Sequence, residues 1–272
     1  MRSCPTVLPM ASIAIVVPTH NRLHLFRQCV EGVLARASDA TSEIVIWDNA
    51  SSDGTAEYSD SLQDPRIRVV HHPVNIGLNA YSLAFPSTSA EYLVQLDDDV
   101  IDAPAGWDRV LLDAFVRLPD VGYLATNLVN DPNDSAARHM YVVTAKEYTS
   151  AVVNGVRLKL GPTGGWCSIT SRALHDQVGG WQHRKQIYWL HDAAYIEDIA
   201  SLGYGAALLE ELKVHHAGGA YYSKSHEAKN AYWRRVARSR RRKNLVKRLL
   251  LAVPPVRRLN ERRHWFRTIP GP

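Results

Sequence analysis

The first hundred residues alternate between short apolar runs, rich in β-branched residues, and segments with helical spacing. The strand-like runs are SIAIVVP (12–18), EIVIW (43–47), RIRVVHH (66–72) and EYLVQL (91–96). Between the first two, apolar residues from Phe26 to Leu34 recur at the spacing of one helix face. Strands that alternate with helices need crossover connections, so we predict an α/β fold with a mainly parallel, doubly wound sheet.

The rest of the chain is less regular. We expect a helix over about 75–85, another over 107–118, and short strands around 121–129, 140–145 and 156–160. A Gly-rich turn, GPTGGW (161–166), precedes a further helix that begins near His191 and stops at Gly203. This region should form a smaller, mixed part of the same fold.

Length and composition indicate one large core. The chain has 272 residues, of which 46% are hydrophobic, enough for one sizeable domain with an appendage. Three widely spaced cysteines without a CxxC pair predict neither a disulfide framework nor a zinc site. The N-terminus lacks the pattern of a signal peptide, and no stretch reaches the roughly 20 apolar residues of a membrane span. A cytoplasmic location is therefore expected.

The charge is distributed unevenly. Residues 223–272 contain 16 Lys and Arg against Glu227 and Glu261, a net charge of 16 − 2 = +14. Since the whole chain carries +5, the body carries 5 − 14 = −9. We therefore expect an acidic body, 1–222, and a basic tail, 223–272, that meet different partners.

The run LDDDV (96–100) places three carboxylates at the end of an apolar strand. Strand alternation would put Asp97 and Asp99 on one face and Asp98 on the other. A pair of carboxylates on one face suits a hard divalent cation such as Mg²⁺ or Mn²⁺. A polar ligand and a solvated turn are the alternatives.

Seven motifs follow one another over most of residues 12–219: VVPTHNR, EIVIWDNASSDGT, NIGLNAYSLAF, LDDDV, GGWCSITSRALHDQVGGW, LHDAAYIEDIASLGY and VHHAGG. Their order and spacing resemble family 2 glycosyltransferases of the GT-A fold. The resemblance implies an inverting, metal-assisted transfer of a sugar from a nucleotide-sugar donor. It also implies a nucleotide-binding half over about 12–100 and an acceptor half over 101–222.

By this resemblance, the LDDDV run is the DxD motif. Asp99 would bind the metal, and Asp97 would contact the ribose or the metal through water. A histidine from His215 or His216 would complete the metal shell, and because adjacent residues of a strand point to opposite sides, only one of them should reach the ion. An imidazole beside carboxylates favours Mn²⁺ over Mg²⁺.

The remaining site residues are also carried over from the family. The nucleotide-sugar would contact Pro18, Thr19, Arg22, Asp48, Asp53, Asn75, Asp97, Asp98, Gly165 and Trp166. Asp48 would accept hydrogen bonds from the N–H groups of uracil, thymine or guanine. Asp53 fits a turn and helix start equally well, with Ser52 as a helix cap, and Trp166 fits a core residue nearly as well as a stacking platform.

Asp192 is the expected general base, because an ionised carboxylate at a helix start can accept the proton of an acceptor hydroxyl. Family members usually have Glu-Asp here, whereas this chain has His191 before Asp192. The substitution leaves the base intact and puts the acceptor contact of the missing Glu in doubt. It also adds a group that titrates near neutral pH.

The basic tail mixes cations with Trp233, Val236 and Leu249 to Leu251. A basic amphipathic helix on an anionic membrane surface explains both components and would bring the enzyme to a lipid-linked acceptor; a glycan acceptor is also expected. A helical cover for the active site, a homodimer contact, a solvated tail and nucleic-acid binding are the alternatives. For the whole chain, the alternatives are a sugar-phosphate nucleotidyltransferase and an inert binding protein that docks through the tail.

Overall fold

The computed structural model describes residues 12–188 and 191–219, together with positions 238, 242, 246, 250 and 255. The chain divides into two compact units, Met1–Tyr222 and Ser223–Pro272. The amphipathic helix expected in the tail lies outside the described residues, apart from those five positions. Within the described residues, no helix combines the length and the apolar character that crossing a membrane requires.

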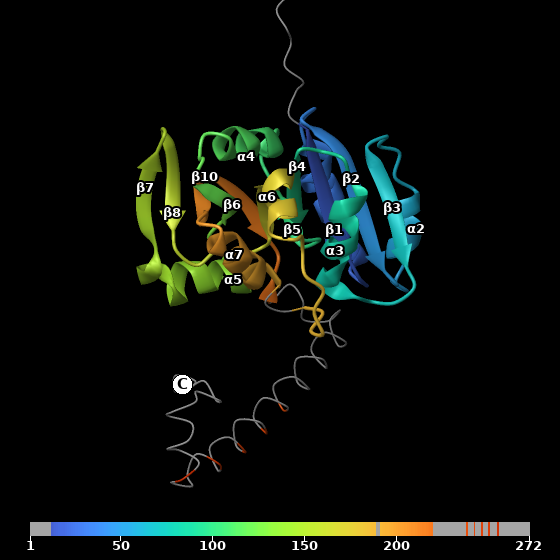
Figure 1. The fold of residues 1–272 in the computed structure, drawn as a ribbon. Coiled ribbons are helices and arrows are strands. Elements are labelled where there is room, and N and C mark those ends of the chain that lie inside the picture. Colours follow the sequence, from blue (N-terminus) through green and yellow to red (C-terminus); the bar gives the residue numbers. More distant parts are fainter. Residues whose placement is uncertain are drawn as a thin grey trace, which may run out of the picture. The chain divides into compact units, whose positions relative to one another are not determined.

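A mixed sheet forms the centre of the first unit (Figure 1). In the described part of the chain its strands are β1 (Ile13–Thr19), β2 (Thr41–Asn49), β3 (Ile67–His72), β4 (Tyr92–Leu96), β5 (Val100–Asp102), β6 (Val121–Leu128), β7 (Thr149–Val153), β8 (Val156–Leu160), β9 (Cys167–Ser171) and β10 (Gly205–His216). Their order is β3-β2-β1-β4-β9-β6-β10-β8-β7, and β5 pairs with β10.

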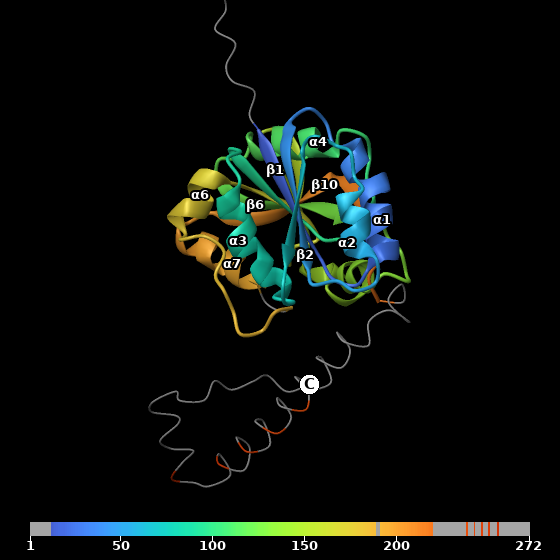
Figure 2. The same cartoon turned by 90° about the vertical axis from the view of Figure 1, so that its right-hand side faces the viewer.

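The first four strands are parallel, with β1 paired to both β2 and β4, and β2 to β3. All seven residues of β1 are buried, as expected for a parallel strand that is covered on both faces. Figure 2 shows α1 and α2 on one side of the sheet and α3, α6 and α7 on the other. The predicted doubly wound, mainly parallel arrangement is therefore confirmed.

The connections contain seven α-helices among the described residues. They are α1 (Leu23–Gly32), α2 (Thr55–Asp60), α3 (Ala80–Ala84), α4 (Trp107–Phe115), α5 (Ser135–Arg138), α6 (Arg172–Gln177) and α7 (His191–Ser201). Short 3-10 turns are η1 (Leu34–Arg36), η2 (Gly77–Asn79), η3 (Phe85–Ser87) and η5 (Ala145–Glu147), and η4 (His139–Val143) is a π-helical turn. The helix expected over 75–85 is thus divided into η2, α3 and η3.

The acceptor-side region is mixed, as predicted. Strand β9 is antiparallel to both β4 and β6, and β10 is parallel to β6 but antiparallel to β8. Strands β7 and β8 form a hairpin at the edge.

The strand expected over 140–145 is wrong, because that segment forms η4 and the turn after it. Asp134 caps the preceding α5 by accepting hydrogen bonds from the backbone N–H groups of Ala136 and Ala137, at 3.0 and 2.9 Å. The helical path therefore begins before the β-branched pair Val142 and Val143, which remains 70% and 65% exposed. The helix cap at Asp134 therefore had a larger effect than the strand propensity of two valines, which counts for little where the side chains face solvent.

Candidate metal and nucleotide site

The three aspartates form the turn that follows β4. The backbone N–H of Val100 donates to the carbonyl of Asp97 at 3.1 Å, which closes the turn. Two neighbouring segments hold it: Asp97 N–H donates to the carbonyl of Trp166 at 2.9 Å, and Ala217 N–H donates to the carbonyl of Asp99 at 2.7 Å. The turn is therefore fixed between the Gly-rich loop and the end of β10.

The side chains of Asp97, Asp99 and His216 converge at this turn. Each offers one metal-ligating atom, and the three atoms lie within 4.8 Å of one another. The Nε2 of His216 is 3.2 Å from Oδ1 of Asp99. Two carboxylates and one imidazole form a donor set that a first-row divalent cation accepts.

Asp98 points to a different partner. Its Oδ1 accepts a hydrogen bond from the guanidinium of Arg22 at 2.5 Å, and the same nitrogen lies 3.0 Å from Oδ2 of Asp99. All three side chains are largely buried. Arg22 thus offsets part of the negative charge of the turn and contacts the candidate metal ligand Asp99.

Of the two adjacent histidines, the structure brings His216 to the aspartates. Its Nδ1 is 2.8 Å from Oδ1 of Asp134, the residue that caps α5. His215 lies on the other side of the strand, with Nε2 2.9 Å from Asp131. Asp134 therefore orients the His216 ring, in the manner of the carboxylates that brace metal-binding histidines.

The close packing of these groups shifts their proton affinities. Burial, together with the neighbouring charge of Asp99, raises the pKa of Asp97 to about 8. Burial opposes a charge on His216, but the carboxylates of Asp99 and Asp134 raise the pKa of its imidazole to about 10. The site therefore has a strong affinity for positive charge.

Asp192 lies in the first turn of α7, close enough for its charge to raise the pKa of Asp97 in the aspartate turn. Burial raises the pKa of its carboxyl, and backbone N–H groups, including that of Gly165, partly offset the rise. A Cβ added at Gly165 would lie 2.2 Å from Nε2 of Gln95 and 3.1 Å from Cβ of Asp192. A side chain at position 165 would therefore displace the amide of Gln95 and press against Asp192.

His191 and Trp166 contact the protein scaffold. The buried His191 has Nε2 3.0 Å from Oδ1 of Asn79 and stacks on Trp181, with ring centroids 6.4 Å apart. Trp166 is half-buried and donates its indole N–H to the carbonyl of Thr126 at 2.9 Å. His191 is therefore held by Asn79 and Trp181, and Trp166 is held by the backbone of Thr126.

The expected base-binding residues lie at the ends of β1 and β2. Pro18 and Thr19 end β1, and the buried Asp48 lies near the end of β2. Asp48 accepts a hydrogen bond from the backbone N–H of Ser51 at 3.1 Å, and its other oxygen is 3.1 Å from Nδ1 of His71. Neither Asp134 nor His71 was among the predicted site residues.

Asp53 and Asn75 make structural hydrogen bonds. Asp53 accepts from Leu23 N–H at 3.0 Å and from the Thr55 hydroxyl at 2.6 Å, so it joins the starts of α1 and α2. The cap expected from Ser52 is wrong, since Gly54 stands at that position. Asn75 accepts from Gly77 N–H at 2.9 Å and donates to the Tyr188 hydroxyl.

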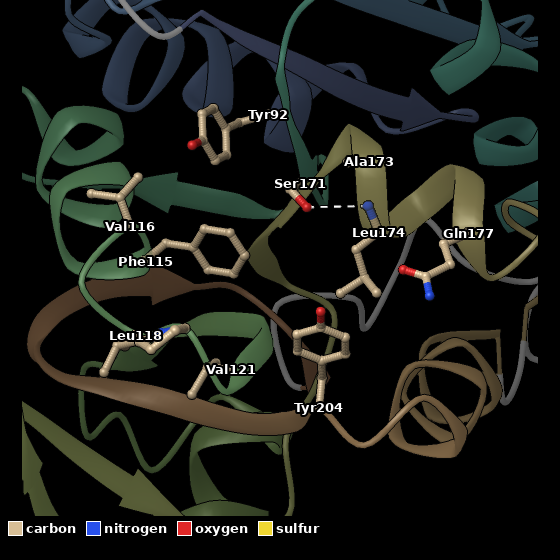
Figure 3. Close-up of a pocket in the computed structure, with 11 residues that line it drawn as sticks. Tyr92, Phe115, Val116, Leu118, Val121, Ser171, Ala173, Leu174, Gln177 and Tyr204 are labelled. Atoms are coloured by element: carbon tan, nitrogen blue, oxygen red, sulfur yellow. Dashed lines mark hydrogen bonds between the residues drawn. The ribbon is translucent and has the colours of Figure 1, made fainter.

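A hollow of about 280 Å³, shown in Figure 3, lies where β4 and β6 begin, at Tyr92 and Val121. It is lined by Tyr92, Phe115, Val116, Leu118, Pro119, Val121, Ser171, Ala173, Leu174, Gln177 and Tyr204. These residues include no carboxylate, histidine or cation, so this hollow has none of the chemistry of the aspartate turn.

The family model for glycosyl transferase family 2 matches residues 14–179, more than half of the chain. The chain belongs to glycosyl transferase family 2. Curated relatives include an uncharacterized protein of Sinorhizobium fredii, 24% identical over 79% of this chain and 25% of its own length. The colanic acid biosynthesis glycosyl transferase WcaA of Escherichia coli, itself described as putative, is 33% identical over 32% of each protein. An undecaprenyl-phosphate mannosyltransferase of Micrococcus luteus is 29% identical over 36% of this chain and 42% of its own length.

The chain thus spans between a quarter and about two fifths of the length of these three relatives. Solved structures confirm the GT-A fold. A mannosyltransferase of Pyrobaculum calidifontis is 20% identical, with a TM-score of 0.56, over 79% of this chain and 58% of its own. GalNAc-T7 is 13% identical, with a TM-score of 0.59, over 78% and 45%. The glucosyl-3-phosphoglycerate synthase of Mycobacterium tuberculosis is 18% identical, with a TM-score of 0.51, over 74% and 70%.

Proposed function

We propose that this chain is a metal-dependent, inverting glycosyltransferase that moves a sugar from a nucleotide-sugar to an acceptor hydroxyl. The observation that carries the proposal is the convergence of Asp97, Asp99 and His216 beside Asp192, at the carboxyl ends of the strands. In open α/β sheets this edge is where ligands bind. Membership of glycosyl transferase family 2 indicates the class of reaction. We propose the role of each residue from its chemistry and its position in the site.

Asp97, Asp99 and His216 would hold the divalent cation. A mixed set of carboxylate oxygen and imidazole nitrogen favours Mn²⁺ over Mg²⁺, and two structural neighbours were solved with Mn²⁺, one with GDP-mannose and one with UDP. When bound, such an ion would neutralise the charge that develops on the diphosphate leaving group. Asp134 would keep the His216 ring in its binding orientation.

Pro18, Thr19, Arg22 and Asp48 would form the nucleotide side of the site. Asp48 would accept a hydrogen bond from a base N–H. Asp97 and Asp98 would lie toward the ribose and diphosphate, and Gly165 and Trp166 toward the sugar. Asn75 and Asp53, which also hold the surrounding loops, would complete the contacts with the nucleotide-sugar. A UDP-sugar is the favoured donor, and dTDP- or GDP-sugars fit the same hydrogen-bonding requirement.

Asp192 would act as the general base. Burial raises the pKa of its carboxyl and so increases its affinity for a proton. The acceptor hydroxyl would lose its proton to Asp192 as the oxygen attacks the anomeric carbon from the face opposite the nucleoside diphosphate. A single displacement of this kind inverts the configuration of that carbon.

The relatives and the charge of the tail support a proposal for the acceptor class. The named relatives include a colanic acid biosynthesis enzyme and an undecaprenyl-phosphate mannosyltransferase. We therefore propose a role in cell-envelope polysaccharide or glycolipid synthesis. The charge of the 223–272 tail suits binding at an anionic, cytoplasmic membrane face.

Calorimetry tests this proposal. UDP, dTDP, GDP and ADP are titrated with and without Mn²⁺ into the wild type, Asp99→Ala and the control Asp102→Ala, which removes an exposed carboxylate three residues away. We expect one nucleotide to bind the wild type and the control only with Mn²⁺, and Asp99→Ala to lose that binding. Absence of binding by every nucleotide in both conditions would overturn the proposal.

A further inference from the structure

His71 connects two carboxylates at the end of β3. Strands β2 and β3 are parallel, and their register places His71 opposite Asp48. The His71 Nδ1 is 3.1 Å from Oδ2 of Asp48, and its Nε2 is 2.9 Å from Oδ1 of Asp60, the last residue of α2. Both ring nitrogens of one imidazole therefore face carboxylate oxygens.

The two carboxylates differ in their surroundings. The side chain of Asp48 is 3% exposed, whereas those of His71 and Asp60 are 43% and 62% exposed. Within the described residues, the charged groups that face His71 are Asp48 from β2 and Asp60 from α2. The arrangement runs from solvent, through Asp60 and His71, to the buried carboxylate of Asp48.

The contacts of Asp48 fix the orientation of its carboxylate. One oxygen accepts from Ser51 N–H at 3.1 Å, and the other faces His71. Each carboxylate oxygen has a second lone pair, so both contacts leave acceptor capacity for a ligand. Without His71, a single backbone contact would remain to hold the group.

We propose that His71 is a positioning residue for nucleobase recognition, which holds the Asp48 carboxylate ready to accept a hydrogen bond from a ring N–H of uracil, thymine or guanine. This inference rests on the proposed function, and on the part of it that assigns the base to Asp48. His71 itself need not touch the nucleotide. It acts through the carboxylate.

The protonation state of His71 then matters for binding. Hydrogen bonds to Asp60 and Asp48 raise the pKa of His71 above the usual value for histidine. The protonated ring has two N–H donors for its two acceptors, and the neutral ring has one. Nucleotide affinity should therefore fall as the pH rises through this pKa, and removal of Asp60 should move the fall to lower pH.

His72 provides a matched control on the same strand. Its ring stacks on Trp47 with centroids 5.6 Å apart, and its Nδ1 is 2.6 Å from the carbonyl of Val74. It has the same side chain, one residue away, but no contact with Asp48 among the hydrogen bonds and ion pairs of the described residues. Substitution of His72 therefore tests for a general effect of losing a histidine at this strand end.

The experiment compares nucleotides with a ligand that has no base. Dissociation constants for UDP, dTDP, GDP and inorganic pyrophosphate, each with Mn²⁺, are measured between about pH 5.5 and pH 9, around the titration range of histidine. The proteins are the wild type, His71→Gln, Asp60→Asn, Asp48→Asn and His72→Gln, each checked for folding by circular dichroism. At each pH, the ratio of nucleotide to pyrophosphate affinity is divided by the same ratio for Asp48→Asn, which lacks the proposed carboxylate, so that the pH dependence of metal binding and of ligand ionisation cancels.

We expect His71→Gln to weaken the bound nucleotide by roughly three- to tenfold, the scale of one hydrogen bond, and to leave pyrophosphate binding unchanged. The affinity ratio should lose its pH dependence in His71→Gln and shift to lower pH in Asp60→Asn, while His72→Gln behaves as the wild type. Equal losses for nucleotide and pyrophosphate in His71→Gln, or no loss for either, would overturn the inference.

The same measurements separate this inference from the proposed function. If the wild type binds no nucleotide, the proposed function fails, and the inference fails with it. If the wild type binds a nucleotide in a metal-dependent way and Asp48→Asn weakens that binding but His71→Gln does not, only the inference fails. If neither substitution changes the affinity, the assignment of the base to Asp48 fails as well, and the metal-dependent transferase remains. An NMR titration of the His71 imidazole, which we expect to move to lower pH in Asp60→Asn, checks the connection directly.

Discussion

Strand β4 joins two edges of the sheet that have opposite chemistry. At its carboxyl end, Asp97 to Asp99 collect with Arg22, Asp192 and His216 around buried charge. At its other end, Tyr92 lines an apolar hollow together with Phe115 and Tyr204. The two ends of β4 therefore lie in different chemical environments, one charged and one apolar. We propose that charge at the first edge works against folding and serves ligand binding, and that packing at the second edge contributes to stability.

The sharpest test of this comparison is Asp192→Asn at the carboxyl edge. If the carboxylate is the general base, its amide replacement should lower kcat by about 10²- to 10⁴-fold, because the amide cannot take the proton. Nucleotide affinity and thermal stability should remain close to those of the wild type. Glu197→Gln, on the same helix, is the control, and a kcat loss of equal size there would contradict the assignment.

Phe115→Ala should lower the stability of the protein and leave nucleotide binding unchanged. Phe115 is 8% exposed and packs edge to face against Tyr92, with centroids 6.0 Å apart. Its removal should lower the free energy of unfolding by about 3 kcal/mol, the lower end of the range for a phenylalanine in a core. Nucleotide affinity measured well below the melting temperature should not change. Val116→Ala, at a 52% exposed neighbour, should cost far less in urea unfolding.

Asp134→Asn tests how the metal ligand is held. Its loss weakens the support of His216 without removing a ligand, so the affinity for Mn²⁺ should fall by roughly 10- to 100-fold. Asp131→Asn, which alters the partner of His215 instead, should leave Mn²⁺ affinity nearly unchanged. If the two substitutions have equal effects, the distinction between the two histidines fails.

The smallest expected effect is a gain in stability from Asp97→Asn. The carboxylate is crowded by Asp98, Asp99 and Asp192, so its neutral replacement should raise the free energy of unfolding of the metal-free protein by about 1 kcal/mol. The same change should weaken Mn²⁺ binding. A loss of metal-free stability in urea would show that the charge at this edge is not a cost to folding.

Most of the fold could be predicted because its signals are local. Four apolar runs, each followed by polar residues, identify four parallel strands and the edge at which their ends meet. Alternation also indicates that His215 and His216 point to opposite sides. It does not indicate which one faces the aspartates, since that depends on how β10 lies against β5 and β6.

The features that sequence reasoning missed depend on distant partners. Asp134 lies 82 residues from His216, and His191 lies 112 residues from Asn79. His71 meets Asp48 because two strands share a register, which no local pattern encodes. In the 140–145 segment the β-branched residues gave a misleading signal, because the helix cap at Asp134, which lies before η4, had already set a helical path.

The position of β10 bears on how the protein is made. It follows the other nine described strands in sequence, yet it lies between β6 and β8 and carries His216. A ribosome must therefore synthesise at least 216 residues before the aspartate turn can meet its histidine. Until then, the nascent chain leaves the edge of β6 unpaired, which exposes it to association with other chains. Chaperone demand during translation should therefore be greatest just before β10 leaves the exit tunnel.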